Sequence, residues 1–446
     1  MAVQVHLPIL HPDQVAAFLA LDKNGRRPFR KAIRCGRRWG KTAFGATIAC
    51  DGAIKRESVG WFAPEHKFIA EAYAEIADIL APVKSASSKV EGVIRTITGG
   101  RIDFWSLEND RAGRSRKYHK VIIDEAAFAK ANMIDIWEKS IEPTLLDYTG
   151  AAYALSNTNG NDTGNFFWKV CKEAQYGFTE YHAPSWQNPH VPLRRPGETE
   201  ADYNERRRQV YAELRAKTHP LVYRQEYEAE FVDFSGVAFF SQDKLLVDGQ
   251  PVDFPAGCDS VFAIIDTAVK QGRDHDATAV SYWAHSTFGQ HPLILLDWDM
   301  VSIDGALLEA WIPSVFARCE ELAAQCRAVY GSTGVYIEDA QSGSILLQQC
   351  ALRGLPAEAL PSKLTSAGKD ARAINASGPV YRGEVKVSRP AFLKTMQFKG
   401  TTQNHMLSQV TGFRIGDKQA ATRADDLFDT FCYAVATTLG NQDGIA

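Results

Sequence analysis

The chain has 446 residues, a length that favours two or three domains. Apolar residues make up 45% of it and charged residues 23%, the balance of a soluble globular protein. No apolar run approaches the ~18 residues that span a bilayer, and Met1 to Pro8 lack the sections of a signal peptide, so no membrane partner is expected. The eight cysteines include no C-x-x-C pair, which argues against a zinc site and favours a reducing, intracellular setting.

The formal net charge is -3, so the chain is not basic overall, but its cations gather in two short stretches. Nine Lys and Arg residues and no acid lie between Lys23 and Cys50, and five more lie between Arg111 and Lys120. Such runs suit the phosphates of a nucleotide, a nucleic-acid backbone, or both. A solvated basic face is the alternative, and the content of the first run weakens it.

That first run holds a glycine-bounded loop between a predicted strand, Phe29 to Ile33, and a predicted helix, Ala43 to Ile54. This is the layout of a P-loop, in which backbone N–H groups and the helix N-terminus cradle phosphates, a Lys reaches the outer phosphates and a Thr holds Mg²⁺. Only three residues separate the two glycines, so the pattern predicts a shortened variant; an ordinary strand-to-helix turn is the alternative. The loop residues are Gly36, Arg37, Arg38, Trp39, Gly40, Lys41 and Thr42.

A short segment upstream of this loop offers a contact for a nucleotide base. His11 to Gln14 precedes an apolar run and predicts a turn followed by a helix. A glutamine just before a P-loop strand can hydrogen-bond both edges of adenine, which makes Gln14 a candidate. An ordinary surface glutamine is the alternative.

Two acids end the run from Lys120 to Glu125, in which three consecutive β-branched residues predict a buried parallel strand. Open α/β sheets bind ligands at the carboxyl ends of such strands. Asp124 can hold Mg²⁺ through water, and Glu125 can polarise the water that attacks a γ-phosphate. An acidic loop is the alternative, but the strand and the P-loop upstream favour the functional interpretation.

The next apolar strand, predicted from Ala152, ends in the small polar residues Ser156, Asn157 and Thr158. These side chains suit a strand tip that senses the γ-phosphate and relays its loss. The alternative is a plain transition from a strand to a turn. The spacing favours the sensor.

A P-loop enzyme often needs an arginine that neutralises charge in the transition state. Arg111 and Arg114 lie on the basic loop before the Asp124 strand, and Arg37 and Arg38 lie in the P-loop itself. In a ring, the arginine can come from the neighbouring subunit. The sequence leaves the choice among these arginines open.

The pattern divides the chain into two α/β domains. The first comprises residues 1–231, and its charged stretch from Thr199 to Glu230 predicts a helical appendage. Residues 232–258 hold glycines and prolines with little regular pattern and are expected to form a linker. A new α/β pattern then fills residues 259–446.

Acids in the second domain follow two predicted strands and open a predicted helix. Asp266 ends one strand, Glu338 follows the strand Gly334 to Ile337, and Asp426 lies at the helix start. In RNase H-like nucleases, carboxylates at such positions hold two divalent cations about 4 Å apart, one activating water and one stabilising the leaving oxygen. The set therefore predicts a two-metal nuclease.

Other acids lie close enough in sequence to join this site. Asp276, on a hairpin returning beside Asp266, is a candidate fourth ligand. Asp425 and Asp429 are alternates to Asp426, because a helix start places several acids near one point. Helix capping and turn formation are the alternative roles of such acids.

The stretch from Gly354 to Lys386 shows little apolar periodicity and predicts an extended loop or hairpin near the acids. A mobile surface loop is one interpretation and a contact with the DNA backbone is the other. The basic residues that would make this contact are Arg353, Lys363, Lys369, Arg372 and Arg382.

At these positions the sequence resembles the large terminase subunits of tailed bacteriophages, the motor and nuclease of DNA packaging. The resemblance rests on the P-loop, the strand ending in Asp124 and Glu125, the segment 156–158 and the later acids, and it covers nearly the whole chain. It implies an α/β fold in two domains, an N-terminal RecA-like ATPase with an additional strand and a C-terminal RNase H-like nuclease.

The resemblance also implies roles for individual residues. Glu125 takes the place of the catalytic base, and Arg114 or Arg111 falls where the family has a trans-acting arginine finger. The family's Arg-Gly pair at that point reads Ala112-Gly113 here. Nucleotide contacts fall on Gln14, Gly36, Arg37, Arg38, Gly40, Lys41, Thr42 and Asp124. Metal ligands fall on Thr42, Asp124, Asp266, Asp276, Glu338, Asp426 and Asp429.

The implied cofactors are ATP and Mg²⁺, with Mn²⁺ as an alternative at the nuclease site. The implied partners are double-stranded DNA, the small terminase subunit and the portal protein of the procapsid, on which a ring of five subunits would dock. The resemblance implies a location in the host cell cytoplasm and not in the mature virion.

Two other functions fit parts of the sequence. A DNA-repair helicase-nuclease shares both chemistries, but it needs strand-separating motifs and a second RecA-like lobe, and only one P-loop lobe precedes residue 230. A nucleotide-gated DNA-binding adaptor without cleavage predicts no nicking of plasmid DNA with Mn²⁺ or Mg²⁺.

Overall fold

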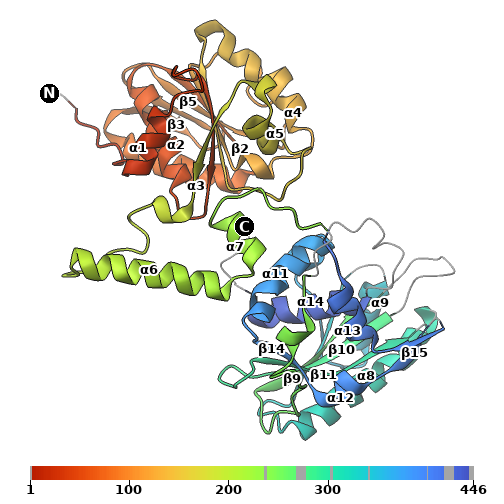
Figure 1. Cartoon of the computed structure of the whole chain (residues 1–446). Helices are drawn as coiled ribbons and strands as arrows, with labels where there is room; N and C mark the ends of the chain where they lie inside the picture. The colour runs from red at the N-terminus through yellow and green to blue at the C-terminus, as the bar shows by residue number, and fades with distance from the viewer. Residues whose placement is uncertain are drawn as a thin grey trace. The chain divides into compact units, whose positions relative to one another are not determined.

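A computed structural model describes residues 3–235, 239–267, 278–301, 305–339, 342–398, 400–415 and 426–440. Contacts divide the chain into two compact units (Figure 1). Unit 1 comprises Met1–Arg215 and Pro220–Asp233, and unit 2 comprises Ala216–His219 and Phe234–Ala446. In this division most of the predicted linker, 232–258, belongs to unit 2.

Unit 1 is built on an eight-stranded sheet. Its strands are β1 (Arg30–Cys35), β2 (Ser58–Ala63), β3 (Lys84–Ser88), β4 (Val93–Thr96), β5 (Arg101–Ser106), β6 (Lys120–Asp124), β7 (Ala151–Ser156) and β8 (Thr179–Ala183). They lie in the order β3-β4-β5-β2-β6-β7-β1-β8. Neighbouring strands are parallel throughout the part β5-β2-β6-β7-β1-β8 of this order. At the other edge, β4 pairs antiparallel with both β5 and β3. The carboxyl ends of β1, β7 and β6 therefore meet at one edge.

Helices cover both faces of this sheet, which explains the uninterrupted apolar run in β6. Ile122 packs in the core that α2 and α3 close, whereas Val121 and Ile123 face the opposite core, which α4 and α5 close. The helices of unit 1 are α1 (Pro12–Leu19), α2 (Lys41–Ile54), α3 (His66–Ile79), α4 (Met133–Ile136), α5 (Phe166–Lys172), α6 (Glu200–Lys217) and α7 (Pro220–Glu226). Short 3-10 or π turns lie at Ala81–Val83, Ala126–Phe128, Trp137–Ile141, Glu142–Tyr148, Ala174–Tyr176 and Ser185–Gln187.

The predicted helical stretch 199–230 is confirmed as α6 and α7, and α6 is the long yellow-green helix of Figure 1. Tyr203 is the buried residue of α6, and its hydroxyl donates to the carbonyl oxygens of Pro189 and Pro192. The rest of α6 is charged and largely exposed. It therefore packs through Tyr203 and through hydrogen bonds from side chains such as Arg207 and Tyr211, rather than through an apolar stripe.

Unit 2 is built on a six-stranded mixed sheet. Its strands are β9 (Ser260–Asp266), β10 (Thr278–His285), β11 (Leu293–Val301), β12 (Ser332–Ile337), β13 (Ala357–Ala359) and β14 (Val385–Val387). They lie in the order β13-β12-β9-β10-β11-β14, and β15 (Met396–Phe398) and β16 (Thr401–Gln403) form a separate hairpin. Central β9 runs parallel to β12 and antiparallel to β10, so β9 and β12 end side by side.

Helices also cover both faces of the unit 2 sheet. The α8 helix packs against one face and contributes Ile312, Phe316 and Leu322 to the core. On the other face α14 packs against β9 and β10, and its Phe431 contacts Trp283 and Phe240. The helices are α8 (Gly305–Gln325), α9 (Ser342–Leu352), α10 (Ser362–Thr365), α11 (Lys369–Tyr381), α12 (Arg389–Leu393), α13 (His405–Gly412) and α14 (Asp426–Leu439), with a 3-10 turn at Gln242–Leu245.

The prediction of a loop or hairpin over 354–386 is wrong. The segment holds β13, α10 and the 13-residue helix α11, which packs against α14. Small side chains hide this helix in the sequence, because its buried face is made by Ala373, Ala376 and Val380. Pro379 also argues against a helix, because proline lacks the N–H of the helical ladder, yet it lies within the last turn of α11.

Within the described residues, no helix is both long enough and apolar enough to cross a bilayer.

Candidate nucleotide and metal centres

The loop between β1 and α2 has the backbone geometry that a P-loop needs. Gly40 caps α2 with φ +95°, a conformation that favours glycine. A Cβ on Gly36 would lie 2.4 Å from the Ser185 hydroxyl oxygen and 2.5 Å from the Tyr227 carbonyl oxygen, so only glycine fits there. Both glycines are thus required by the fold, and the first turn of α2 begins with Lys41.

The two functional pairs predicted from the sequence meet at the carboxyl edge of the unit 1 sheet. The Lys41 Nζ lies 2.8 Å from the Glu125 Oε1, and the Thr42 hydroxyl donates to the Asp124 Oδ2 at 3.4 Å. Glu125 adopts φ +52°, in the left-handed region that a glutamate rarely occupies. This backbone turn points the Glu125 carboxylate back toward the loop instead of along β6.

Charge in this centre is strongly coupled. Burial raises the pKa of Asp124 to about 7, an effect that Lys41 opposes and Glu125 reinforces. Desolvation by burial lowers the pKa of Lys41, but the neighbouring groups together, chiefly the Glu125 carboxylate and also Asp124, outweigh it, so the pKa is raised. A divalent cation held by Asp124 and Thr42 would favour the ionised carboxylate.

Gln14 lies against the P-loop. Its side-chain amide donates to the carbonyl oxygen of Gly40 at 2.9 Å, and its amide oxygen accepts from the backbone N–H of His11 at 3.0 Å. The residue is 4% exposed. Gln14 therefore stabilises the P-loop through its hydrogen bond to Gly40, and a contact with adenine stays a prediction.

The predicted sensor segment after β7 is tied to α7. Ser156 accepts a hydrogen bond from the N–H of Ala127, next to the acidic pair, at 3.1 Å. The Asn157 side-chain amide donates to the Glu226 Oε2 at 3.1 Å, and Thr158 donates to the Glu230 carbonyl oxygen at 2.7 Å. The segment thus links the edge that carries Asp124 with the chain that follows α7.

Glu226 is a residue that the sequence did not single out. The Arg37 Nε of the P-loop donates to the same Glu226 Oε2 at 2.6 Å, so this oxygen joins the loop to Asn157. Arg37 is 189 positions away in sequence, and a Glu at the end of a short helix carries no motif that would reveal the contact.

The other arginine candidates are spread over unit 1. Arg38 is exposed and adopts φ +66° in the P-loop. Arg114 is exposed, and its Nε donates to the Ser140 hydroxyl at 3.0 Å, while Arg111 is exposed on the same loop. The identity of a trans-acting finger therefore stays a prediction.

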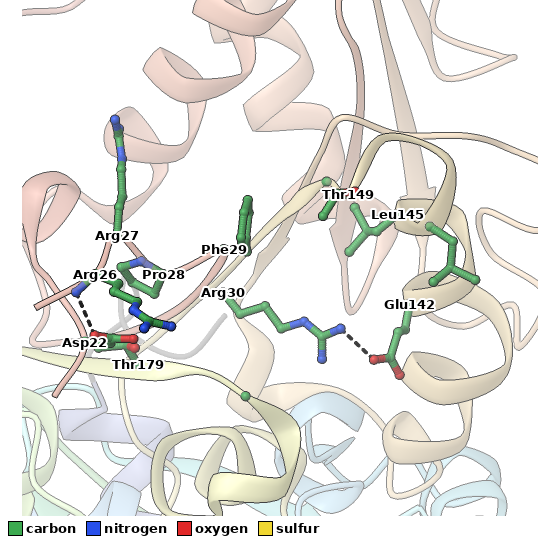
Figure 2. Close-up of a pocket in the computed structure, with 13 residues that line it drawn as sticks. Asp22, Arg26, Arg27, Pro28, Phe29, Arg30, Glu142, Leu145, Thr149 and Thr179 are labelled. Carbon is green, nitrogen blue, oxygen red and sulfur yellow. Dashed lines mark hydrogen bonds and ion pairs between the residues drawn. The ribbon is translucent and has the colours of Figure 1, made fainter. Parts of the chain in front are cut away.

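A cavity of about 510 Å³ lies at the opposite end of β1 from the P-loop (Figure 2). Arg30, one of the cations that line it, donates to the Glu142 carboxylate at 2.7 Å. Figure 2 marks this ion pair with a dashed line. The cavity contains none of the predicted site residues.

The acids of unit 2 converge where β9 and β12 end. The N–H of Glu338 donates to the Ile265 carbonyl oxygen at 3.3 Å, which sets Glu338 beside Asp266. From the first turn of α14, Asp429 and Asp426 also act on Asp266. Asp266 and Asp429 are 7% and 5% exposed. The structure thus brings Asp266, Glu338, Asp426 and Asp429 together, whereas Asp276 and Asp425 lie outside the described residues.

The carboxyl groups of this cluster act on one another. Burial, followed by Asp429, Glu338 and Asp426, raises the pKa of Asp266 well above its usual value. Hard carboxylate oxygens are the ligands that Mg²⁺ and Mn²⁺ prefer, so the donor set fits such ions. Within the described residues, however, no group of three or more acidic, His or Cys side chains is already set to hold an ion.

No protein-family model matches the chain. The large terminase subunits of Thermus phage G20c and Thermus virus P23-45 are each 31% identical to it over 141 residues, which cover 28% of this chain. The match spans only about a quarter, 25%, of the length of these curated relatives. The structure of a large terminase from a thermophilic bacteriophage, in complex with ADP, superposes with a TM-score of 0.60 at 11% identity and covers 96% of this chain and 99% of that one.

The fold shared with this ADP-bound terminase extends over both units and confirms the predicted two-domain α/β class. The sequence match independently points to the same proteins, so the resemblance drawn from the P-loop and the later acids is confirmed. By sequence over 141 residues and by fold over nearly the whole chain, the protein is similar to large terminase subunits.

Proposed function

We propose that the chain is an ATP-driven translocase that moves viral double-stranded DNA into a procapsid and an endonuclease that cuts concatemeric DNA with two divalent cations. One observation carries the proposal. A single chain holds a P-loop centre with Lys41 and Glu125 in unit 1 and a four-carboxylate cluster around Asp266 in unit 2. The ADP complex of the thermophilic phage terminase supports nucleotide use by this fold.

In unit 1, bound nucleotide would change the partners of the charged side chains. Lys41 would leave Glu125 for the outer phosphates, because a polyphosphate offers more negative charge than one carboxylate. Glu125 would then be available to orient and deprotonate the attacking water. Thr42 and Asp124 would hold Mg²⁺, and the ionised form of Asp124 that this requires is favoured by the cation.

In unit 2, Asp266, Glu338 and Asp429 would hold divalent cations, with the less buried Asp426 beside them. Mg²⁺ would serve there, with Mn²⁺ as an alternative. The bound ions would supply an activated water and stabilise the leaving oxygen of the cleaved strand. The chain's own contribution is a set of carboxylates from β9, the end of β12 and α14, whose mutual repulsion the ions relieve.

The partners follow from the role proposed for the protein. Double-stranded DNA is the substrate, and the portal protein and the small terminase subunit are the protein partners. A ring of five chains docked on the portal would supply the arginine finger of each active site from a neighbour. The protein would act in the cytoplasm of the host cell and be absent from the mature virion.

A plasmid-cleavage assay with Mg²⁺ or Mn²⁺ tests the nuclease part directly. We expect the wild-type chain to nick and linearise plasmid DNA and Asp266→Ala to leave it intact, with the two proteins equally folded by circular dichroism. Cleavage by both would place the nuclease centre elsewhere. An absence of cleavage by the wild type with either ion would favour the adaptor function without cleavage.

A further inference from the structure

Two basic side chains from the first turn of α11 form ion pairs with the acid cluster of unit 2. The Arg372 Nη2 lies 2.9 Å from the Asp429 Oδ1, and the Lys369 Nζ lies 3.6 Å from the Asp429 Oδ2. The Arg372 side chain is 11% exposed and the Asp429 side chain 7%. A guanidinium so close to a buried carboxylate is a strong electrostatic partner, because water screens the pair poorly.

Arg372 also reaches a second acid of the cluster. Its Nη1 donates to the Tyr433 hydroxyl at 2.6 Å, and that hydroxyl donates to the Glu338 Oε1 at 3.2 Å. The guanidinium lies 5.1 Å from the centre of the Tyr433 ring, which keeps it in one place. One side chain of α11 therefore holds Asp429 directly and Glu338 through Tyr433.

A divalent cation needs the carboxylate oxygens that Arg372 now engages. Two cations cannot share the Asp429 lone pairs without strong repulsion in a buried site.

We infer that Arg372 is a positioning residue of the nuclease centre, a resident counter-ion that a divalent cation has to displace from Asp429. The inference rests on the proposed nuclease function. It assigns Arg372 two effects of opposite sign. It stabilises the folded chain while no cation is bound, and it weakens the binding of the first cation. Arg372 thereby sets the concentration of Mg²⁺ or Mn²⁺ at which the cluster becomes a metal site.

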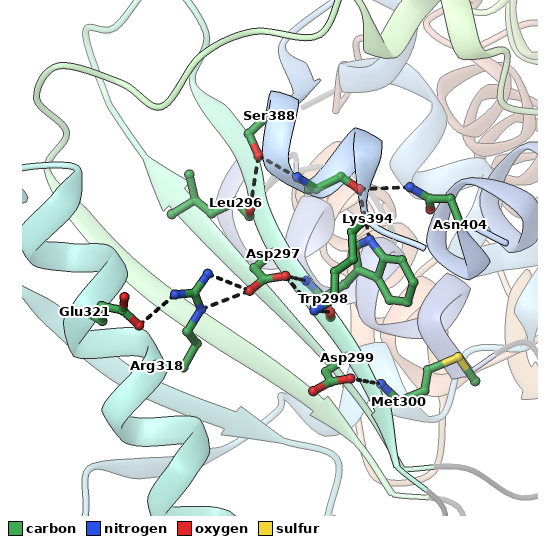
Figure 3. A network of polar contacts seen from close by, with 11 residues as sticks. Leu296, Asp297, Trp298, Asp299, Met300, Arg318, Glu321, Ser388, Lys394 and Asn404 are labelled. Carbon is green, nitrogen blue, oxygen red and sulfur yellow. Dashed lines mark hydrogen bonds and ion pairs between the residues drawn. The ribbon is translucent and has the colours of Figure 1, made fainter. Parts of the chain in front are cut away.

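Unit 2 contains a matched pair of cations around another acid (Figure 3). Asp297 on β11 is held by Arg318 of α8 at 2.8 Å and by Lys394 at 2.8 Å. The Asp297 side chain is 14% exposed, so this pair is also screened poorly by water, and Arg318 belongs to the helix on the face of the sheet opposite α14. Arg318→Gln therefore removes a similar ion pair without touching the acid cluster.

The test measures Mn²⁺ binding to the full chain by titration calorimetry and thermal unfolding in the presence of EDTA. The Asp266→Ala chain gives the background from other sites. We expect Arg372→Gln to lower the melting temperature in EDTA and to bind Mn²⁺ about tenfold more tightly, which corresponds to about 1.4 kcal/mol. Arg318→Gln should lower the melting temperature without changing Mn²⁺ affinity.

An unchanged or weaker Mn²⁺ affinity in folded Arg372→Gln would overturn the inference, because a displaced competitor must raise affinity when removed. If Arg372→Gln fails to fold, Arg372→Met serves instead. Methionine removes the positive charge but keeps a long, unbranched side chain, so the Mn²⁺ affinity of this variant should also exceed that of the wild type; an affinity equal to that of the wild type would overturn the inference. Failure of the proposed function looks different: no chain would bind Mn²⁺ above background and the wild type would not cleave DNA.

Discussion

The two candidate centres use an ion pair in opposite ways. In unit 1 the cation Lys41 belongs to a glycine-bounded loop at a helix N-terminus, and it pairs with Glu125 at 2.8 Å. In unit 2 the acids dominate, and Arg372 pairs with Asp429 at 2.9 Å. A phosphate entering unit 1 would replace the carboxylate, whereas a divalent cation entering unit 2 would replace the guanidinium.

Under the proposed function, the difference explains how one chain keeps two phosphate-handling sites distinct. The P-loop offers N–H groups and a lysine to an anion, and we expect its affinity for that anion to depend on the ion pair between Lys41 and Glu125. The acid cluster offers oxygens to a cation, and its binding strength is set by Arg372. In each centre, removing the internal partner should strengthen ligand binding, and the predictions below test this symmetry.

Glu125→Gln is expected to have the largest effect in unit 1. The amide cannot take a proton from water, so ATP hydrolysis should fall at least about 100-fold. The amide also cannot form an ion pair with Lys41, so nucleotide affinity should stay the same or rise. Steady-state hydrolysis and binding of a fluorescent ATP analogue measure the two effects. Loss of binding together with hydrolysis would mean that Glu125 supports the loop rather than the chemistry.

Asp124→Asn should change how stability depends on pH. The pKa of Asp124 is raised to about 7, so the folded chain binds this proton more tightly than the unfolded chain does. The stabilisation from this proton is complete below about pH 4 and is lost as pH rises through about 7. Relative to Asp124→Asn, the wild type should lose a few kcal/mol of unfolding free energy over that range, because a pKa difference of one between the folded and unfolded chain corresponds to about 1.4 kcal/mol.

Denaturant unfolding at pH 5 and pH 8 measures this difference. A difference between wild type and Asp124→Asn that does not change with pH would show that Asp124 is not held protonated by its surroundings. Asp266→Asn provides the parallel measurement in unit 2, where burial and three neighbouring acids also raise the pKa of the carboxyl.

Glu226→Gln is expected to have the smallest effect. The Arg37 side chain is 48% exposed, so its pair with Glu226 contributes about 1 kcal/mol or less. Releasing Arg37 toward bound phosphate should raise nucleotide affinity by about two- to fivefold. Glu198, which pairs with Arg206 at 2.6 Å in the same unit, gives the control Glu198→Gln, for which nucleotide affinity should not change. Equal nucleotide affinities in the wild type, Glu226→Gln and Glu198→Gln would show that Glu226 has no influence on nucleotide binding.

The sequence predicts unit 1 better than unit 2 for a physical reason. The P-loop and the Asp124-Glu125 pair are each a continuous segment of the sequence. The glycines of the loop predict its turn, and the β-branched residues before Asp124 predict the buried strand. The acids of unit 2 come from three elements far apart in the chain. Their convergence depends on the parallel pairing of β9 with β12 and on α14 packing across them.

The roles that the sequence missed depend on packing rather than on motifs. The sequence indicated Arg372 only as a candidate contact with the DNA backbone, because small side chains build much of the buried face of its helix and periodicity did not reveal α11. Glu226 meets Arg37 only because α7 folds back onto the P-loop. Among the acids opening α14, Asp429 lies about one turn beyond Asp426 and is buried near Asp266, and which of the two would bind metal stays a prediction.

The most direct test of two separate centres on one chain is a crossed assay of ATP hydrolysis and plasmid cleavage on Lys41→Ala and Asp266→Ala. We expect Lys41→Ala to lose hydrolysis and retain cleavage, and Asp266→Ala to lose cleavage and retain hydrolysis. Loss of both activities in either well-folded variant would contradict the assignment.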